Sequence, residues 1–241
     1  MKKINVVVDI ETLSLRPDAA IISIAAVPFI LDKEGLEKCA KYGYTGVPAF
    51  DEIIKKEVSD MNIYPPFHES IDATSCAMAG LAFDMETVKF WSEMPDEAKS
   101  AIMEKPRVSI RQALEDFVAY LENLKAINQA DELIIWVQGS DFDIPVLKNA
   151  MYKVLGLTPE TLPWKHRNIR DARTFMLESL SLVYPNTPVN DLYGKLLPYD
   201  ELTKHNSLHD CFWTALNIIN EKRRLYGMLT SGDGGEKASS D

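Results

Sequence analysis

The sequence has few of the residues that build disulfide or zinc scaffolds. It contains only Cys39, Cys76 and Cys211, an odd number without Cys-x-x-Cys spacing. We therefore expect reduced thiols, typical of a cytosol, and neither a disulfide framework nor a zinc site. No apolar run approaches a membrane span, and the run behind Met1 meets Asp9 too early to form a signal peptide. The sequence thus predicts a cytoplasmic protein that does not bind membranes.

Positive charge is also scarce. The chain carries 26 Lys and Arg against 36 Asp and Glu, which gives a net charge of -10 over 241 residues. This balance argues against broad, non-specific binding of duplex nucleic acid, which relies on many cations at the phosphates. It is compatible with a protein that grips a few nucleotides at one strand end and uses metal ions as its positive charge. The hydrophobic fraction of 46% is ordinary for a globular chain of one or two domains.

An apolar run near the N-terminus is interrupted by two carboxylates. Val6-Val7-Val8 predicts a buried strand that continues through Asp9 and Glu11. Residues two apart point to the same face of a strand, so the two charges would lie side by side in a partly dry place. A divalent cation such as Mg²⁺ would neutralise them. The alternative is that Asp9 ends the strand and Glu11 lies exposed in a loop, and this pair alone does not decide between the two.

Apolar periodicity predicts an α/β fold for the rest of the chain. Residues 133–137 are apolar throughout, which is typical of a strand covered on both faces and predicts a mixed sheet flanked by helices. Asp84 and Ser109 are expected to cap helices, Ser109 as part of a capping box with Gln112. Further strands are predicted at 20–29, 35–44 and 169–173. Further helices are predicted at 141–155, after the strand at 169–173 as far as residue 182, and from residue 207 onward. Residues 51–69 are ambiguous, 185–202 are predicted to form a loop, and 228–241 a disordered tail.

Two further acidic sites follow predicted elements. Asp143 ends the run Ser140-Asp141-Phe142-Asp143 at the start of a helix, and Asp210 lies in the first turn of the last helix, with four residues between it and His205. Taken alone, each Asp is more often a helix cap, because a carboxylate suits the positive end of the helix dipole. Taken alone, His205 is more often a histidine of a surface loop.

Together these residues resemble a known family. Asp9-Ile10-Glu11-Thr12, then Phe142-Asp143, then His205-x4-Asp210 are similar in type and order to the three motifs of the DEDDh branch of the DnaQ-like 3′-5′ exonucleases. Arg170 to Thr174 and an insertion at 84–98 are similar to phage exonuclease A and exonuclease VIII-like members. The likeness covers about residues 4–225. It implies an RNase H-like mixed five-stranded sheet flanked by helices, in one exonuclease domain at 1–227, located in the host cytoplasm if a phage encodes it.

The resemblance also implies a reaction and its residues. The expected activity is 3′-5′ hydrolysis of single-stranded DNA to 5′-mononucleotides with two divalent ions, Mg²⁺ or Mn²⁺. RNA is the open alternative, because recognition of the 2′-hydroxyl is not visible in the motifs. The implied residues are Asp9, Glu11, Asp143 and Asp210 as catalytic metal ligands, His205 as the general base, and Thr12, Leu13 and Phe142 as contacts of the terminal nucleotide.

Several alternatives stay open at this point. Asp141 is an unexpected second carboxylate beside Phe142. The resemblance favours Asp143 as the ligand, because it follows Phe142 as in the family, and whether Asp141 joins the site stays open. A haloacid-dehalogenase-type phosphatase would use Asp9 as its nucleophile, but it requires Asp-x-Asp where Glu11 stands. A non-catalytic nucleic-acid-binding module would be favoured by the loss of a carboxylate, and none is missing. The sequence leaves the oligomeric state open and allows a homodimer. We expect Trp91, Trp136 and His209 to be structural, and Arg170 and Arg173 to bind either phosphate or Asp171 and a helix end.

Overall fold

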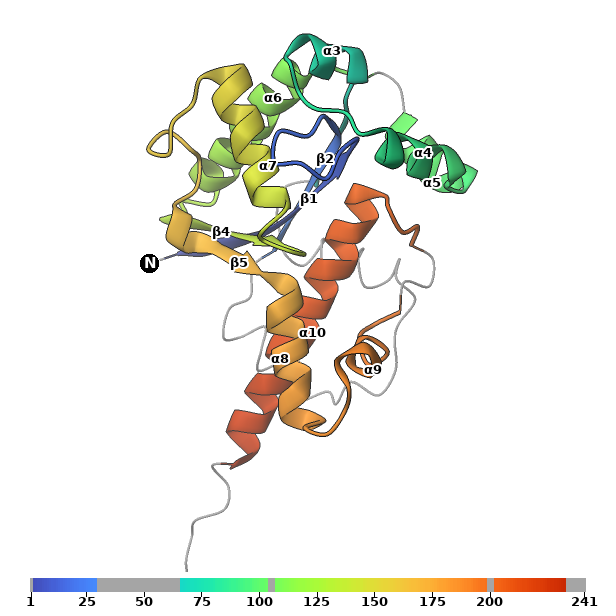
Figure 1. The fold of residues 1–241 in the computed structure, drawn as a ribbon. Coiled ribbons are helices and arrows are strands. Elements are labelled where there is room, and N and C mark those ends of the chain that lie inside the picture. Colours follow the sequence, from blue (N-terminus) through green and yellow to red (C-terminus); the bar gives the residue numbers. More distant parts are fainter. Residues whose placement is uncertain (1, 30–65, 104–106, 199–201, 233–241) are drawn as a thin grey trace, which may run out of the picture.

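A five-stranded mixed sheet forms the centre of the structure, a computed structural model that describes residues 2–29, 66–103, 107–198 and 202–232. β1 (Lys3–Thr12) is the middle strand. It pairs antiparallel with β2 (Ile21–Phe29) and parallel with β4 (Glu132–Val137). β3 (Phe67–Ser70) pairs antiparallel with β2 at one edge, and β5 (Ile169–Asp171) pairs parallel with β4 at the other. This is the predicted mixed sheet (Figure 1).

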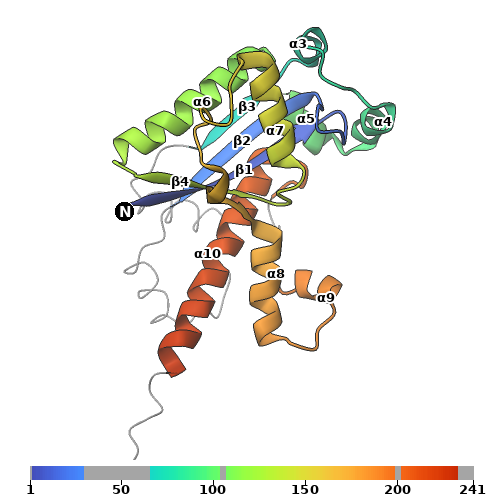
Figure 2. The ribbon, with the colours of Figure 1, turned by 60° about the vertical axis from the view of Figure 1, so that its left-hand side comes forward.

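Helices cover both faces of the sheet, as the apolar strands predict. Ile4, Val6 and Val8 of β1 pack with α6 (Ile110–Ile127) and α7 (Asp143–Ala150) on one face. Val7 packs on the other face with α8 (Ala172–Val183) and α10 (Ser207–Gly232). Figure 2 shows the two helix pairs on opposite sides of the strands. Because side chains alternate along a strand, the odd-numbered Asp9 and Glu11 share the face of Val7, on which α10 lies.

The apolar stripe of α6 explains why this helix forms and where it packs. Leu114, Phe117 and Leu121 follow helical spacing and are fully buried against the sheet. The hydroxyl of Ser109 accepts a hydrogen bond from the Gln112 N–H at 3.2 Å, as predicted for an N-cap. The other half of the predicted capping box is absent within the described residues. The Gln112 amide donates to the Asp116 carboxylate at 2.9 Å instead of reaching back to Ser109.

A small helical insertion follows β3 and lies beside the end of β1. It consists of α3 (Ala73–Met78), α4 (Met85–Glu93) and α5 (Asp96–Met103). As predicted, the Asp84 carboxylate caps α4 by accepting a hydrogen bond from the Glu86 N–H at 3.0 Å. The Asp84 N–H donates to the Leu13 carbonyl at 2.8 Å. This hydrogen bond joins the insertion to the residue directly after β1, and Figure 1 shows α4 near that end of the sheet.

Some boundaries differ from the prediction. Residues 185–202 were expected to be a loop, yet α9 (Val189–Tyr193) forms there because Leu192 is buried among residues of α8 and α10. The predicted helix 141–155 ends as α7 at Ala150 and continues as a π turn, η1 (Met151–Leu155). α10 continues past Gly227 to Gly232, because Met228 and Leu229 are good helix formers that outweigh one glycine. The structure thus corrects the predicted tail at 228–232, and residues 233–241 lie outside the described part.

Three further predictions concern single segments. The strand expected at 35–44 and Cys39 lie outside the described residues. The edge strand β3 begins within the ambiguous segment and the helix α3 follows it; no sequence pattern predicted either element. Among the described residues, Cys76 and Cys211 are buried free thiols. Among the described residues, no helix combines the length and the hydrophobicity that crossing a membrane requires.

Candidate active site

Three of the predicted carboxylates meet at the end of β1. Asp9 and Glu11 of β1 and Asp210 of α10 each offer an oxygen, and these oxygens all lie within 4.8 Å of one another. Strand alternation aims Asp9 and Glu11 at the face on which α10 lies, and Asp210 stands in the first turn of that helix. The alternative in which Glu11 lies in an exposed loop is wrong, because β1 runs to Thr12.

Asp143 joins the cluster from α7. It is the first residue of that helix and its side chain is buried, with only 6% of the residue exposed. It does not act as the helix cap, because Phe142 holds the N-cap position without a side-chain hydrogen bond. Its carboxyl instead makes a backbone hydrogen bond with Ile10, the residue between Asp9 and Glu11. Asp141 is exposed. Of these two aspartates, Asp143 therefore lies with the acidic residues of β1.

These side chains surround one cavity of about 370 Å³. β1 supplies two of the carboxylates, and α7 and α10 supply one each. The rest of the wall comes from the residue after β4, the start of α8 and the turn before α10. Four carboxylates face only two fully charged cations in this lining, Arg173 and Lys204. The residues that line the cavity are Asp9, Ile10, Glu11, Gln138, Phe142, Asp143, Arg173, Lys204, His205 and Asp210.

The electrostatics of the cavity show that the carboxylates lack sufficient counter-charge. Burial raises the pKa of Asp9 well above its usual value, and the charges of Glu11, Asp143 and Asp210 raise it further. Burial followed by the charges of Asp210 and Asp143 does the same for the pKa of Glu11. Burial raises the pKa of Asp143 to about 7, although backbone hydrogen bonds and the charge of Arg173 oppose this. A divalent cation bound by these oxygens would remove the repulsion, so the donor set fits a hard cation such as Mg²⁺.

His205 lies on the wall of the cavity in the turn before α10. Its φ is 62°, a left-handed conformation that costs a non-glycine residue about 1–2 kcal/mol. The turn is held by the His205 N–H, which donates to Asp210 Oδ2 at 3.0 Å, and by Asn206, whose side chain caps the first turn of α10. The imidazole meets the rings of Phe90 and Trp91 edge-on. His205 is thus an exposed residue of the turn before α10, and its ring contacts Phe90 and Trp91 beside the acidic cluster.

The predicted nucleotide contacts divide into two groups. Phe142 lines the cavity. Thr12 is buried, and its hydroxyl donates to the Ser14 carbonyl at 2.7 Å, while Leu13 packs partly buried on the core. Thr12 and Leu13 do not line the cavity, although they directly follow the strand that carries the carboxylates.

The residues expected to be structural are mostly so. Trp91 and Trp136 are buried, and the His209 Nδ1 accepts a hydrogen bond from the Thr203 N–H at 3.0 Å. Arg170 donates to the Ile169 carbonyl at 2.8 Å and does not line the acidic cavity. Arg173 is different: it reaches the acidic cavity while its Nη2 donates to the Gln138 carbonyl at 3.0 Å.

Three residues at the site carried no signal in the sequence analysis. Gln138 directly follows β4 on the wall of the acidic cavity, and Lys204 precedes His205 on the same wall. Phe90 contacts the His205 ring from the insertion, which is far away in the sequence. Adjacency to a motif could have drawn attention to Lys204, but no local pattern indicates the contact of Phe90.

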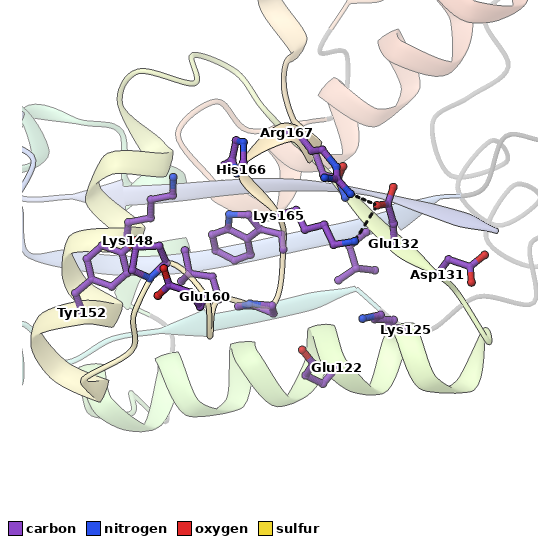
Figure 3. A pocket seen from close by; sticks show the side chains of 16 residues that line it. Glu122, Lys125, Asp131, Glu132, Lys148, Tyr152, Glu160, Lys165, His166 and Arg167 are labelled. Carbon is purple, nitrogen blue, oxygen red and sulfur yellow. Dashed lines mark hydrogen bonds and ion pairs between the residues drawn. The ribbon is translucent and has the colours of Figure 1, made fainter. Parts of the chain in front are cut away.

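A second cavity of about 330 Å³ contains none of the predicted site residues. It lies beside the start of β4, among α6, η1 and residues 159–168. Glu132 Oε1 lies 3.2 Å from Lys165 Nζ and 3.4 Å from Arg167 Nη2. The dashed lines in Figure 3 mark these two contacts. The hydrogen bond from Lys165 and the two positive charges lower the pKa of Glu132. Acidic and basic side chains mix here, so this cavity lacks the one-sided charge of the acidic cluster.

Comparisons with known proteins identify a family and a fold. The model of the family of 3′-5′ exoribonuclease Rv2179c-like domains matches residues 4–218. The nuclease domain of 3′hExo, a DEDDh family member bound to rAMP, has a TM-score of 0.50 at 12% identity, over 96% of this chain and 94% of that one. Apo exonuclease I has a TM-score of 0.50 at 17% identity, over 96% and 45%. None of the curated proteins searched matches the chain.

A third solved structure, cell-death related nuclease 4 (CRN-4), has a TM-score of 0.50 at 13% identity and covers 93% of this chain. The chain spans 64% of that protein and 45% of exonuclease I. At these identities the likenesses concern the fold, and they confirm the predicted RNase H-like architecture.

Proposed function

Because the chain belongs to the family of 3′-5′ exoribonuclease Rv2179c-like domains, we propose that it is a metal-dependent exonuclease that removes 5′-mononucleotides from the 3′ end of single-stranded RNA. The observation that carries the proposal is the convergence of Asp9, Glu11 and Asp210 within 4.8 Å, beside the buried Asp143. An acidic cluster of this kind supplies the oxygen ligands that divalent cations prefer. Without a cation it destabilises the fold, because burying unpaired charges costs free energy.

The choice of RNA rests on the family description. The sequence by itself placed single-stranded DNA first and RNA second, and the family whose model matches the chain is described by exoribonuclease activity. The fold likeness to exonuclease I carries no argument for DNA, since it concerns the fold alone. The closer relation to phage exonuclease A-like members stays a prediction from residues 170–174. Neither the phosphatase nor the non-catalytic alternative gains support from the family match.

Two divalent cations, Mg²⁺ or Mn²⁺, would supply the charge that makes a water molecule more acidic and shelters the leaving oxygen. Asp9, Glu11, Asp143 and Asp210 would hold them. At neutral pH an empty cluster would keep protons on part of these carboxyls, because their pKa values are raised by burial and mutual repulsion. We therefore expect metal binding to release protons.

The chain's own side chains would perform the remaining work. His205 would accept the proton of the attacking water, and its N–H bond to Asp210 would fix the turn from which the ring acts. Arg173 and Lys204 would attract the phosphates to the mouth of the cavity. Phe142 would contact the terminal nucleotide from the cavity wall. Leu13, directly after β1, would be a second contact, whereas Thr12 is buried and would support the end of the strand.

The test compares RNA and DNA strands of one sequence, labelled at the 5′ end, with Mg²⁺, Mn²⁺ or EDTA. We expect a ladder that shortens from the 3′ end of RNA, with 5′-mononucleotides as products and no cleavage in EDTA. Asp9→Asn should abolish the ladder, whereas Asp141→Asn, which changes an exposed aspartate nearby, should preserve it. An intact RNA strand under every metal condition would refute the exonuclease proposal. Faster degradation of DNA than of RNA would keep the reaction and overturn the substrate.

A further inference from the structure

We propose that Phe90 and Trp91 are positioning residues for His205, so that the helical insertion sets the place of the imidazole relative to the carboxylates of β1. The inference deepens the proposed function, because the catalytic meaning of His205 rests on it. The contacts themselves do not depend on the reaction, and they can be tested separately.

The three rings form one cluster. The Phe90 and His205 centroids are 5.4 Å apart with an interplanar angle of 85°, and the Trp91 and His205 centroids are 6.4 Å apart with an angle of 84°. Phe90 also meets Trp91 edge-on at 5.6 Å. Edge-to-face contact is a preferred geometry of aromatic rings at such distances. Two rings from one helix therefore restrict the imidazole from neighbouring directions.

The helix that carries these rings is tied to the strand that carries the acids. The Trp91 indole Nε1–H donates to the Thr12 carbonyl at 2.8 Å, and this bond is buried. Thr12 directly follows Glu11 at the end of β1. α4 thus contacts the acidic strand through one side chain and His205 through two. These contacts fix the distance between the His205 ring and β1, which the long chain between residues 91 and 205 leaves undetermined.

His205 requires such a contact because its backbone bonds do not set its ring. The N–H bond to Asp210 and the left-handed φ of 62° fix the turn. They leave free the two side-chain torsions, which decide where the imidazole nitrogens point. Among the described residues, the ring contacts of His205 come from Phe90 and Trp91.

Phe90 offers the sharper test of the two residues. It is 43% exposed, so truncation should leave the fold intact, whereas Trp91 is buried. Phe83 is a matched control, since it is also a phenylalanine of the insertion, is 42% exposed, and has no ring contact with His205 within the described part of the chain. If Phe90 instead stacks on a nucleotide base, its removal should weaken substrate binding and leave turnover unchanged.

The kinetic experiment measures kcat and KM on the RNA strand for Phe90→Ala, Phe90→Tyr and Phe83→Ala. We expect Phe90→Ala to lower kcat by roughly 10- to 100-fold with KM changed less than about threefold, because a displaced base costs turnover and not binding. Phe90→Tyr, which keeps the ring, should retain most of the rate, and Phe83→Ala all of it. A rise in KM at unchanged kcat would overturn the proposal in favour of base stacking.

A double substitution tests whether Phe90 acts through His205. Once His205→Ala has removed the imidazole, adding Phe90→Ala should lower the residual kcat no further. If the two losses multiply, Phe90 acts independently of His205 and the proposal is wrong.

An NMR experiment makes the test independent of activity. In the wild type, the ring currents of Phe90 and Trp91 should change the chemical shifts of the His205 ring protons. These chemical shifts should differ from the wild-type values in Phe90→Ala and equal them in Phe83→Ala. Circular dichroism should confirm that both variants are folded. Unchanged His205 signals in folded Phe90→Ala would overturn the positioning role. Inactivity of the wild type on RNA and DNA would instead overturn the proposed function. The NMR result would still show whether Phe90 positions the His205 ring.

Discussion

Replacing Asp143 by Asn should stabilise the metal-free protein at alkaline pH. Asp143 is buried, and burial raises its pKa from 3.8 to about 7 in the folded protein. The folded state therefore binds the proton more tightly than the unfolded state, and this contribution to stability is present at acid pH and is lost as the pH rises through about 7. Asn has no proton to lose and keeps an oxygen that can accept a hydrogen bond, so the variant should escape this loss.

The size of the effect follows from the pKa difference. About 3 pKa units at 1.36 kcal/mol each give a ceiling of roughly 4 kcal/mol for the full transition. Between about pH 5 and about pH 8.5, roughly 2–3 kcal/mol of this should be lost, because part of the loss has already occurred below pH 5. The neighbouring carboxyls should add to the gain of the variant, since the charge of Asp143 also raises the pKa of Asp9 and of Glu11.

Urea unfolding in EDTA at the two pH values measures this difference, with Asp141→Asn as the control. The free energy of unfolding of Asp143→Asn minus that of the wild type should be larger at about pH 8.5 than at about pH 5. The increase should be roughly 2–3 kcal/mol. The exposed Asp141 should show almost no such pH dependence. Mg²⁺ at alkaline pH should raise the stability of the wild type more than that of Asp143→Asn, because a ligand is missing in the variant. An equal stability difference at both pH values would refute the assignment of a buried, destabilising charge to Asp143.

Two further substitutions separate chemistry from folding. His205→Ala should lower kcat on RNA by about 10²–10⁴-fold, the usual contribution of a general base, and should leave stabilisation by Mg²⁺ intact; full activity would remove His205 from the reaction. Phe117→Ala should reduce the free energy of unfolding by about 3–5 kcal/mol, because this side chain is fully buried between α6 and the sheet. The expected drop in the urea midpoint should occur with an unchanged far-UV circular dichroism spectrum, and a loss below about 1 kcal/mol would contradict the packing described for α6.

Local patterns predicted the parts of the fold that depend on neighbouring residues. The strand through Val6 to Glu11, the caps at Asp84 and Ser109, and the start of the last helix at Ser207 all agree with the structure. Side-chain alternation and hydrogen bonds over three or four residues are properties of a short segment, so they can be inferred from that segment alone.

The acidic site was predictable in its members and not in its geometry. The order of motifs indicated Asp9, Glu11 and Asp210, and strand alternation placed the first two on one face. The rule that an Asp at a helix start is a cap was misleading for Asp143, whose carboxyl is used beside Ile10 of β1. Only the pairing of β1 with β4 brings α7 close enough to decide between Asp143 and Asp141.

The sequence by itself determined most of the strands and helices and the set of carboxylates, because these depend on the order of neighbouring residue types. Tertiary structure alone decided that α9 forms where Leu192 becomes buried, and that Phe90 meets His205. These outcomes depend on contacts between residues far apart in the chain. The free energy that stabilises these contacts comes from surfaces that form only after the sheet and its helices have assembled. Local residue spacing therefore does not predict them.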